Sequence, residues 1–346
     1  MKAIVKKAPG EGHVEYMDVP EPTPGANEVK IKVAYAGLCG TDFSIIKGTF
    51  PSNPPVILGH EYSGVIESVG AGVTDFKKGD RVISETAQVI CGRCERCLSG
   101  RYLMCTKRLS IGYGVNGGMA EYIIVRQEIL HRVPDNVALD EAAVSEPAAC
   151  ACHAVLDHVH VKPTHNVLVI GPGTIGQLVA QLAIVTGANV IVCGTESDKK
   201  RLELIQSMGA TTIASNDKDD MLKRIMELTD NKGIDIFFDC SGATDAINCG
   251  LNSLKPRGAL VAVGLSKPNI DFDYNLIPMK ELQVFGSYAH INMSWANALA
   301  LMGKGRFNIK PLIELKFPFS KWEEALDSAL SGKGIKVLLY PDGSTL

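Results

Sequence analysis

The sequence predicts an α/β protein in which a doubly wound parallel sheet accompanies a mostly-β, partly open barrel. Strands alternate with helices over residues 151–287, and a glycine-rich loop joins the first of these strands to the first helix. Residues 1–89 instead contain short strands broken by Pro and Gly. A chain of 346 residues is also too long for one ordinary core. We therefore expect a first domain over 1–150, a second over 151–287, and a return to the first over 288–346.

The predicted barrel rests on alternating apolar and polar residues near the start of the chain. Glu28–Val33 alternates as a half-buried strand does, and Gly64–Gly70 and Gly79–Ile83 predict two further strands. Glu21–Gly25, with two prolines and a glycine, predicts a turn before them. Strands of this kind form a barrel whose connections carry the polar residues.

The composition excludes several classes of partner. Apolar residues make up 46% of the chain, and a formal net charge of −3 gives no electrostatic reason to expect nucleic acid or an anionic membrane. No apolar run approaches the roughly 20 residues of a membrane helix. Met1–Lys7 alternates like an edge strand and has no signal-peptide core, which favours the cytoplasm. The ten cysteines are then better explained as metal ligands or buried thiols than as disulfides.

Four cysteines in residues 91–105 form the most specific local pattern. Cys91, Cys94 and Cys97 are spaced Cys-x-x-Cys-x-x-Cys, and Cys105 follows after seven intervening residues. Such spacing lets one loop place four thiolates tetrahedrally around a structural zinc. Two disulfides or an iron–sulfur cluster are the alternatives. A nucleic-acid-binding zinc knuckle is disfavoured, because the surrounding residues are neither strongly basic nor rich in aromatics.

The second domain contains a nucleotide-binding motif. Val167–Ile170 is a short apolar strand, and Gly171, Gly173 and Gly176 follow it in a Gly-x-Gly-x-x-Gly pattern that opens an amphipathic helix. In a Rossmann domain the first glycine makes the turn, the second admits the pyrophosphate and the third packs helix against strand. The motif therefore predicts a bound dinucleotide.

The choice between NAD and NADP depends on the end of the second strand. Glu196 lies near the position at which a carboxylate binds the ribose hydroxyls, which favours NAD. Counted from the strand, however, Thr195 lies at the tip, and Arg201 is close enough to bind a phosphate, so NADP stays an alternative. The predicted cofactor-binding residues are Gly171, Gly173, Thr174, Ile175, Gly176, Glu196, Arg201, Val263 and Ser287.

Candidate ligands for a second zinc occur in the first domain. His60 and Glu61 are adjacent between Gly59 and Gly64, Cys39 lies upstream, and Glu146 lies downstream, before a proline. A catalytic zinc takes about three protein ligands from such residues and keeps one position open.

The order of these motifs resembles that of the zinc-dependent medium-chain dehydrogenase/reductase superfamily, and within it the sorbitol (L-iditol) and L-threonine dehydrogenase branch. The resemblance spans nearly the whole chain, and Gly59–Gly64 with Gly70 and Val73 fits the family's zinc signature. It implies a GroES-like catalytic domain that carries the 91–105 lobe, beside a Rossmann domain. By this resemblance Cys39 and His60 bind the catalytic zinc, and Glu61 and Glu146 share the remaining protein position.

The resemblance also implies a reaction. Zinc lowers the pKa of a secondary alcohol, hydride passes to the nicotinamide, and a ketone remains. Thr41 is placed to accept the hydroxyl proton, and it also suits the N-cap of a helix. Many relatives carry a His three residues after this threonine, whereas this chain has Ser44. Animal sorbitol dehydrogenases carry Arg-Tyr where this chain has Ala289 and His290, so His290 is either a pocket residue or solvated.

The implied function is oxidation of a polyol, free or phosphorylated, to a ketose with NAD. L-Threonine 3-dehydrogenase and 2,3-butanediol-type dehydrogenase use the same ligands and are the alternatives. A non-catalytic binding protein on the same fold is the alternative from another class. The strand predicted at Leu282–Ser287 would lie at the sheet edge, where relatives form a homodimer or homotetramer.

Overall fold

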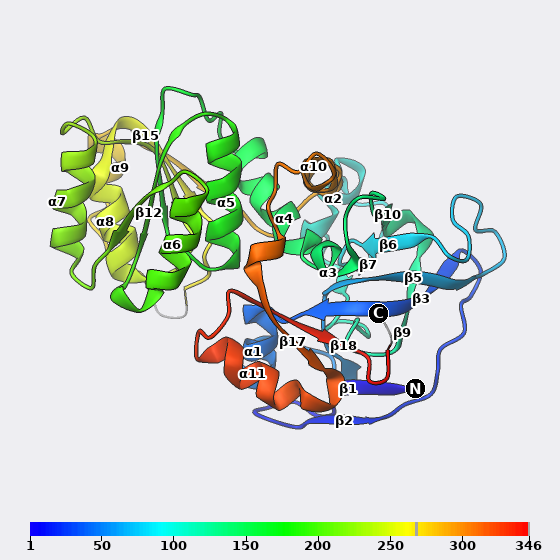
Figure 1. Ribbon diagram of the computed structural model, residues 1–346. Coiled ribbons are helices and arrows are strands. Elements are labelled where there is room, and N and C mark those ends of the chain that lie inside the picture. Colours follow the sequence, from blue (N-terminus) through cyan, green and yellow to red (C-terminus); the bar gives the residue numbers. More distant parts are fainter. Residues whose placement is uncertain (267–268, 345–346) are drawn as a thin grey trace. The chain divides into compact units, whose positions relative to one another are not determined.

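The computed structural model describes residues 1–266 and 269–344, which fold into two compact units (Figure 1). The first unit comprises Met1–Glu146, Ile291–Lys304 and Ile309–Leu346. The second comprises Pro147–His290 and Gly305–Asn308. The chain therefore leaves the first unit, forms most of the second, returns, and adds the short segment Gly305–Asn308 to the second before it continues in the first.

The first unit is built mainly of β-sheets. Its largest sheet has the strand order β10-β6-β5-β3-β18-β17, with β9 also paired to β3. Smaller sheets have the orders β2-β1-β4 and β7-β8. The strands are β1 Lys2–Lys6, β2 Val14–Asp18, β3 Glu28–Gly37, β4 Val56–Ile57, β5 Glu61–Val69, β6 Arg81–Ser84, β7 Ala87–Val89, β8 Leu109–Ser110, β9 Tyr122–Arg126, β10 Leu130–Arg132, β17 Ile313–Pro318 and β18 Lys336–Tyr340.

Apolar side chains from these sheets form a large core in the first unit, and a smaller apolar cluster lies at β1 and β4. Ile31, Ile66 and Leu339, from the adjacent strands β3, β5 and β18, are all nearly inaccessible to solvent. Burial of each such side chain contributes about 1.5–3 kcal/mol to stability. The helices of this unit are α1 Gly40–Ile46, α2 Glu95–Leu98, α3 Leu139–Ala142, α10 Asn292–Gly303 and α11 Trp322–Leu330.

The second unit is a parallel sheet with the order β13-β12-β11-β14-β15-β16. Helices α5 and α6 cover one face, and α7 and α8 cover the other (Figure 1). The strands are β11 Asn166–Ile170, β12 Asn189–Gly194, β13 Thr211–Ala214, β14 Ile234–Asp239, β15 Leu254–Ala262 and β16 Gln283–Gly286. The helices are α5 Thr174–Val185, α6 Lys199–Ser207, α7 Lys218–Leu228, α8 Thr244–Ser253 and α9 Leu276–Met279. This order is that of a doubly wound dinucleotide-binding sheet, so the predicted fold class is confirmed.

Two helix starts follow from local sequence. Asp217 caps α7, because its side chain accepts the backbone N–H of Asp219 at 2.7 Å and that of Asp220 at 3.3 Å. Helix α4, Ser145–Cys152, begins just before Pro147, whose missing N–H is tolerated in a first helical turn. Glu146 is therefore held in the first turn of α4.

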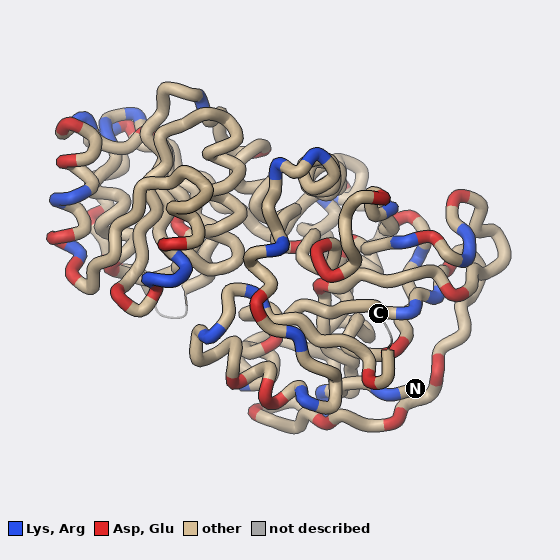
Figure 2. The backbone as a smooth tube through the Cα atoms, viewed as in Figure 1, with Lys and Arg blue, Asp and Glu red and all other residues tan. Residues whose placement is uncertain are grey.

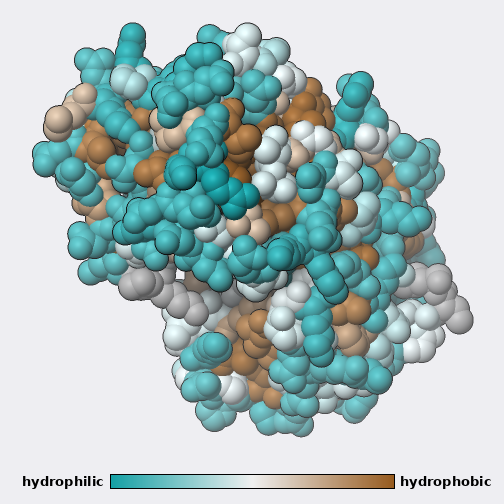
Figure 3. Space-filling view, turned by 60° about the vertical axis from the view of Figure 1, so that its left-hand side comes forward, coloured by the Kyte–Doolittle hydropathy of each residue, from teal (hydrophilic) through white to brown (hydrophobic). Residues whose placement is uncertain are grey.

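The surface carries both signs of charge. Figure 2 shows basic and acidic residues interspersed over both units. On the face drawn in Figure 3, hydrophilic residues cover most of the surface and apolar residues are exposed in smaller areas between them. Within the described ranges, no helix is both long enough and apolar enough to cross a bilayer.

Candidate functional site

Three of the four predicted catalytic-zinc ligands lie together in the first unit. Cys39 is the N-cap of α1, two residues after the end of β3, whereas Glu61 begins β5 and His60 immediately precedes it. One ligand atom from each of the three lies within 4.8 Å of the other two. Gly59 makes the preceding turn with φ +90°, and a Cβ at this position would lie 2.6 Å from Met119 Cγ. The turn thus aims His60 at the cysteine.

The buried polar atoms at this cluster fit a metal ion. His60 and Glu61 are 7% and 1% exposed, and Asp42 is fully buried. Among the described residues, His60 Nδ1 and Asp42 Oδ1 have no hydrogen-bond partner, although they lie only 3.8 Å apart. Metal-bound histidines commonly turn their second ring nitrogen toward a carboxylate. With Nδ1 turned to Asp42, Nε2 is the nitrogen available to a metal.

The electrostatic environment also favours a cation. Burial by itself would lower the pKa of His60, but Cys39, Asp42 and Glu146 raise that pKa well above its usual value. An environment that stabilises a buried imidazolium attracts positive charge. A zinc ion would supply this charge and leave the imidazole neutral.

Glu146 and Thr41 lie close to the same cluster. Glu146 contributes to the raised pKa values of both His60 and Lys336, which places its carboxylate near the three ligands. Thr41 Oγ1 lies 3.7 Å from Cys39 Sγ. Cys39, and not Thr41, is the N-cap of α1. The proposed proton-relay threonine is therefore a residue of the first helical turn.

Sequence reasoning missed a lysine at the cluster. Lys336, on β18, is 3% exposed and forms an ion pair with Glu61 Oε2. Burial alone would lower the pKa of Lys336, but Glu61, Cys39 and Glu146 raise it. Lys336 is the one charged residue in the otherwise apolar segment 335–339. This pattern is the sequence signal from which a buried lysine could have been predicted.

The four cysteines of residues 91–105 also lie together. The four sulfur atoms lie within 4.8 Å of one another, with Cys94 Sγ 3.5 Å and Cys91 Sγ 3.9 Å from Cys97 Sγ. Zinc–sulfur bonds of about 2.3 Å make the edge of a tetrahedron about 3.8 Å. All ten cysteines are free thiols, so no disulfide links the four. An iron–sulfur cluster would separate its thiolates further, and the geometry fits a single zinc ion best.

A buried network holds this lobe to the rest of the first unit. Glu85, 2% exposed, accepts a hydrogen bond from Tyr102 of the lobe and another from Asn292 of α10 at 2.8 Å. His131 Nε2 lies 3.0 Å from Glu85, and its ring stacks on Trp295. Burial would raise the pKa of Glu85, but hydrogen bonds from His131, Tyr102 and Asn292 lower it below its usual value. Glu85 therefore stays ionised.

The glycine loop in the second unit fits a pyrophosphate. A Cβ on Gly176 would overlap the Gly171 carbonyl oxygen, so the helix and the loop approach as closely as their backbones allow. A Cβ on Gly173 would meet nothing within 4 Å, so the space above this residue is open. Thr174 and Ile175 begin α5, whose N-terminal N–H groups attract anions.

An adjoining pocket of about 280 Å³ fits part of a nucleotide. Its lining includes Gly171, Thr195 and Asp198 but not Glu196. Glu196 is about half exposed and pairs with Lys199 at 3.2 Å. Asp198 Oδ1 pairs with the predicted phosphate-binding residue Arg201 at 3.1 Å. Strand β12 ends at Gly194, so Thr195 occupies the strand tip.

Later strands bring two further predicted residues to the same edge of the sheet. The backbone N–H of Val263 donates to Asp239 O, and that of Ser287 donates to Ala262 O, each at 2.9 Å. Both residues therefore lie at the carboxyl ends of parallel strands, where nucleotides bind in this fold. His290 is fully buried, which contradicts the solvated alternative for this residue.

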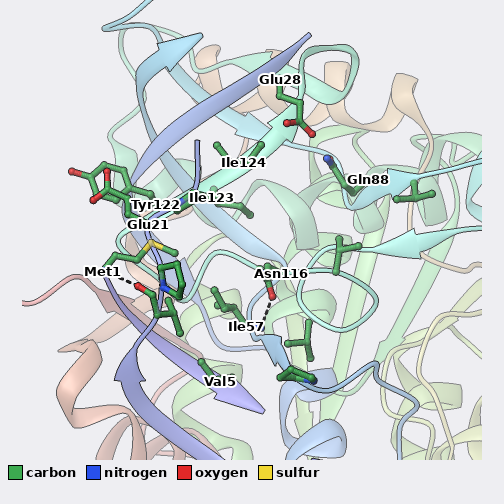
Figure 4. Close-up of a pocket in the computed structure, with 18 residues that line it drawn as sticks. Met1, Val5, Glu21, Glu28, Ile57, Gln88, Asn116, Tyr122, Ile123 and Ile124 are labelled. Atoms are coloured by element: carbon green, nitrogen blue, oxygen red, sulfur yellow. Dashed lines mark hydrogen bonds between the residues drawn. The ribbon is translucent and has the colours of Figure 1, made fainter. Parts of the chain in front are cut away.

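A second pocket, in the first unit, is separate from the metal ligands. It has a volume of about 650 Å³, and its lining includes Val5, Tyr122 and Ile123 (Figure 4). Asn116, on the wall of the pocket, accepts the backbone N–H of Ile57 at 3.1 Å. None of the predicted zinc ligands belongs to this lining.

Comparisons with known proteins match both units. The alcohol dehydrogenase GroES-like domain family matches residues 25–135, and the zinc-binding dehydrogenase family matches residues 174–304. The chain is 41% identical to a sorbitol dehydrogenase of Halalkalibacterium halodurans over 342 residues, which cover 99% of each chain. It is 39% identical to a D-arabitol-phosphate dehydrogenase of Enterococcus avium, over 98% of this chain and 97% of that protein.

A solved structure agrees in fold and length. A zinc-binding dehydrogenase from Sinorhizobium meliloti 1021, bound to NADP, superposes with a TM-score of 0.91 at 28% identity, over 98% of this chain and 99% of that one. These relatives match the chain over nearly its full length, and each is named as a dehydrogenase. On this evidence of sequence and fold, the chain belongs to the zinc-dependent medium-chain dehydrogenase superfamily.

Proposed function

We propose that this dehydrogenase oxidises a secondary alcohol of a sorbitol- or iditol-like polyol, free or phosphorylated, to a ketose with NAD. The observation that carries the proposal is the buried cluster of Cys39, His60 and Glu61, whose ligand atoms lie within 4.8 Å of one another. The relatives named for sorbitol and arabitol phosphate support a polyol as the substrate.

Each residue of the cluster has a proposed task. Cys39 and His60 would hold zinc, and Glu61 and Glu146 would share the third protein position. Asp42 would orient His60 through the ring nitrogen that faces away from the metal. When bound, zinc lowers the pKa of a substrate hydroxyl, and the nicotinamide accepts the hydride.

The proton would leave along α1. Thr41 lies beside Cys39 and would accept the hydroxyl proton. Ser44 follows three residues later, so the two hydroxyls share one face of the helix. The Ser44 hydroxyl donates to Gly40 O at 3.3 Å, and the residue is partly exposed to solvent. This route would carry the proton outward without a histidine.

The dinucleotide would lie over the glycine loop. Gly173 leaves open space for the pyrophosphate, and the adjoining pocket would take part of the adenosine half. We propose NAD as the cofactor, with Glu196 as the ribose ligand. NADP is the alternative, because Thr195 rather than Glu196 lines the pocket and a related structure holds NADP.

A substrate panel tests the proposal. Purified protein is assayed with NAD and with NADP against sorbitol, xylitol, a hexitol phosphate, L-threonine and 2,3-butanediol. Each assay is repeated after chelation, and zinc per chain is measured alongside. Chelator-sensitive turnover of a polyol or polyol phosphate, with two zinc ions per chain, is the expected result.

The other outcomes separate the alternatives. Selective turnover of L-threonine or butanediol would leave the mechanism intact and replace the substrate. Turnover that persists after the catalytic zinc has been removed would contradict the tasks given to Cys39 and His60. Two zinc ions and measurable cofactor binding without turnover of any alcohol would favour the non-catalytic alternative.

The same proposal includes an assembly and a compartment. Strand β16 lies at one edge of the parallel sheet, and its Val284 side chain is 49% exposed. Pairing of this edge with a second copy would form a homodimer, and two such dimers would form a homotetramer. The free cysteines support a reducing compartment, and we propose the cytoplasm.

A further inference from the structure

Lys336 connects two of the proposed zinc ligands, although its positively charged ammonium group cannot itself bind zinc. Its Nζ forms an ion pair with Glu61 Oε2 and donates a hydrogen bond to the Leu38 carbonyl at 2.9 Å. Leu38 immediately precedes Cys39 in the chain. A single ammonium group thus contacts the carboxylate of one ligand and the backbone beside another.

The contact crosses the central strand β3 through a gap at Gly37. Glu61 of β5 is the register partner of Gly37, and β18 pairs with β3 on the opposite side. A Cβ on Gly37 would overlap Glu61 Oε2 and would lie 2.8 Å from Lys336 Cε. Only a residue without a side chain leaves room for the ion pair at this position.

Both partners of the Lys336–Glu61 ion pair are buried. Lys336 and Glu61 are 3% and 1% exposed, so water cannot replace either partner. Loss of one partner of a buried ion pair is strongly destabilising, because it leaves a buried charge without compensation. The lysine therefore holds the carboxylate through Oε2, while one carboxylate oxygen lies within 4.8 Å of the ligand atoms of Cys39 and His60.

We propose that Lys336 is a positioning residue of the metal centre, which fixes the Glu61 carboxylate and the backbone before Cys39 in the geometry that binds zinc. This inference rests on the proposed function only in requiring zinc at Cys39 and His60. Without Lys336 the Glu61 carboxylate can rotate, and the ligand set is no longer preorganised. The role would be indirect, through Glu61, because the ammonium group is not itself a ligand.

Cobalt substitution tests the inference without an activity assay. Wild type, Lys336→Met, Lys336→Arg and Glu61→Gln are loaded with Co²⁺, and the visible absorption bands that report ligand geometry are compared. Zinc affinity is measured by competition with a chelator. We expect Lys336→Met to change the cobalt spectrum and to weaken zinc binding about 10- to 100-fold, as loss of an outer-shell partner does. Lys336→Arg keeps the positive charge, so it is expected to retain most of the wild-type cobalt spectrum and zinc affinity.

A double substitution shows whether Lys336 acts through Glu61. In the Glu61→Gln background, Lys336→Met is expected to change the spectrum and the zinc affinity much less than in wild type. Lys30→Met is the matched control, because Lys30 is also largely buried and pairs with Glu21, away from the metal ligands. It is expected to leave both readouts unchanged.

The outcomes distinguish failure of this inference from failure of the proposed function. A wild-type protein that takes zinc only in the four-cysteine lobe would contradict the proposed function itself. Two metal sites in wild type with an unchanged cobalt spectrum in folded Lys336→Met would overturn the role of Lys336 alone. If Lys336→Met does not fold, Gly37→Ala decides, because it fills the gap while both charges remain. An unchanged spectrum in Gly37→Ala would equally overturn the inference.

Discussion

Asp42 Oδ1 lies 3.8 Å from His60 Nδ1, while Oδ2 of the same carboxylate accepts the backbone N–H of Cys39 at 2.9 Å. Asp42 is fully buried, and burial raises the pKa of its carboxyl group. One carboxylate on α1 therefore contacts the backbone of one proposed zinc ligand and faces the ring of another. Its position explains how a seven-residue helix can orient two ligands, one that follows β3 and one that precedes β5.

Replacement of Asp42 by Asn tests this orienting role. The amide keeps the shape of the side chain but removes the charge that faces His60 Nδ1. We expect zinc affinity at the catalytic site and kcat/KM each to fall about 10- to 100-fold, as for other outer-shell partners of metal-bound histidines. Chelator competition gives the affinity, and steady-state kinetics with the preferred polyol gives kcat/KM.

Asp75→Asn is the matched control, because Asp75 is an exposed residue of the same unit. It should leave zinc affinity and kcat/KM within about twofold of wild type, since surface substitutions rarely exceed ±0.5 kcal/mol. Wild-type zinc affinity in a folded Asp42→Asn protein would show that His60 is oriented by other contacts.

Glu85 makes stability depend on pH in the acidic range. The folded protein lowers the pKa of Glu85 below its ordinary value of 4.5, so at low pH protons bind the unfolded chain more readily than the folded one. The stabilisation is complete above the unfolded-state pKa and is lost as the pH falls through the lower folded-state value. We expect Glu85→Gln to lower the free energy of unfolding by about 1–3 kcal/mol at pH 7. Urea unfolding at a series of pH values measures the difference, which should shrink below pH 4.5.

The control for Glu85 is an exposed glutamate. Glu128, more than half exposed, pairs with Arg126 at 3.5 Å, and such pairs contribute about 0–1 kcal/mol. Glu128→Gln should therefore change stability little at any pH. A Glu85→Gln deficit that stays constant from pH 7 to pH 3.5 would contradict the assigned ionisation and would indicate a loss of packing alone.

Local patterns were sufficient to predict much of this protein. The doubly wound parallel sheet of the second unit could be predicted from apolar strands, a glycine loop and alternating helices, because each of these signals lies within a few neighbouring residues. The four-cysteine lobe could be predicted in the same way, since its ligands span only residues 91–105. Short-range spacing constrains such features before any tertiary contact is known.

Lys336 could not be found in the same way. Its contact with Leu38 joins residues 298 positions apart, and the gap at Gly37 exists only because β18, β3 and β5 are neighbours. Glu196 shows a second limit. Counting residues cannot say whether Glu196 or Thr195 enters the nucleotide pocket, because a shift of one residue at the end of β12 exchanges the side chains that face it.

Alanine substitutions at two glycines of the nucleotide loop are expected to affect different properties, cofactor affinity in one case and stability in the other. Gly173→Ala adds a methyl group to open space, so stability should be unchanged while NAD affinity falls roughly tenfold, about 1.4 kcal/mol. Gly176→Ala would force the methyl group against the Gly171 carbonyl and should lower stability by about 1–3 kcal/mol. Thermal unfolding and fluorescence titration with NADH separate the two effects. Equal NADH affinity in wild type and Gly173→Ala would place the pyrophosphate elsewhere.

Loss of the lobe zinc should loosen the lobe and leave the second unit folded. Cys97 Sγ is close to the sulfur atoms of both Cys91 and Cys94, so Cys97→Ser removes one of four ligands from a single ion. We expect zinc content to fall from two ions to one per chain, and trypsin to cleave after Arg93 or other arginines of residues 91–105. NADH affinity should persist, because the nucleotide loop belongs to the other unit. Cys150→Ser, outside the lobe, is the control and should retain both zinc ions; retention of both by Cys97→Ser would show that the four thiolates are not one site.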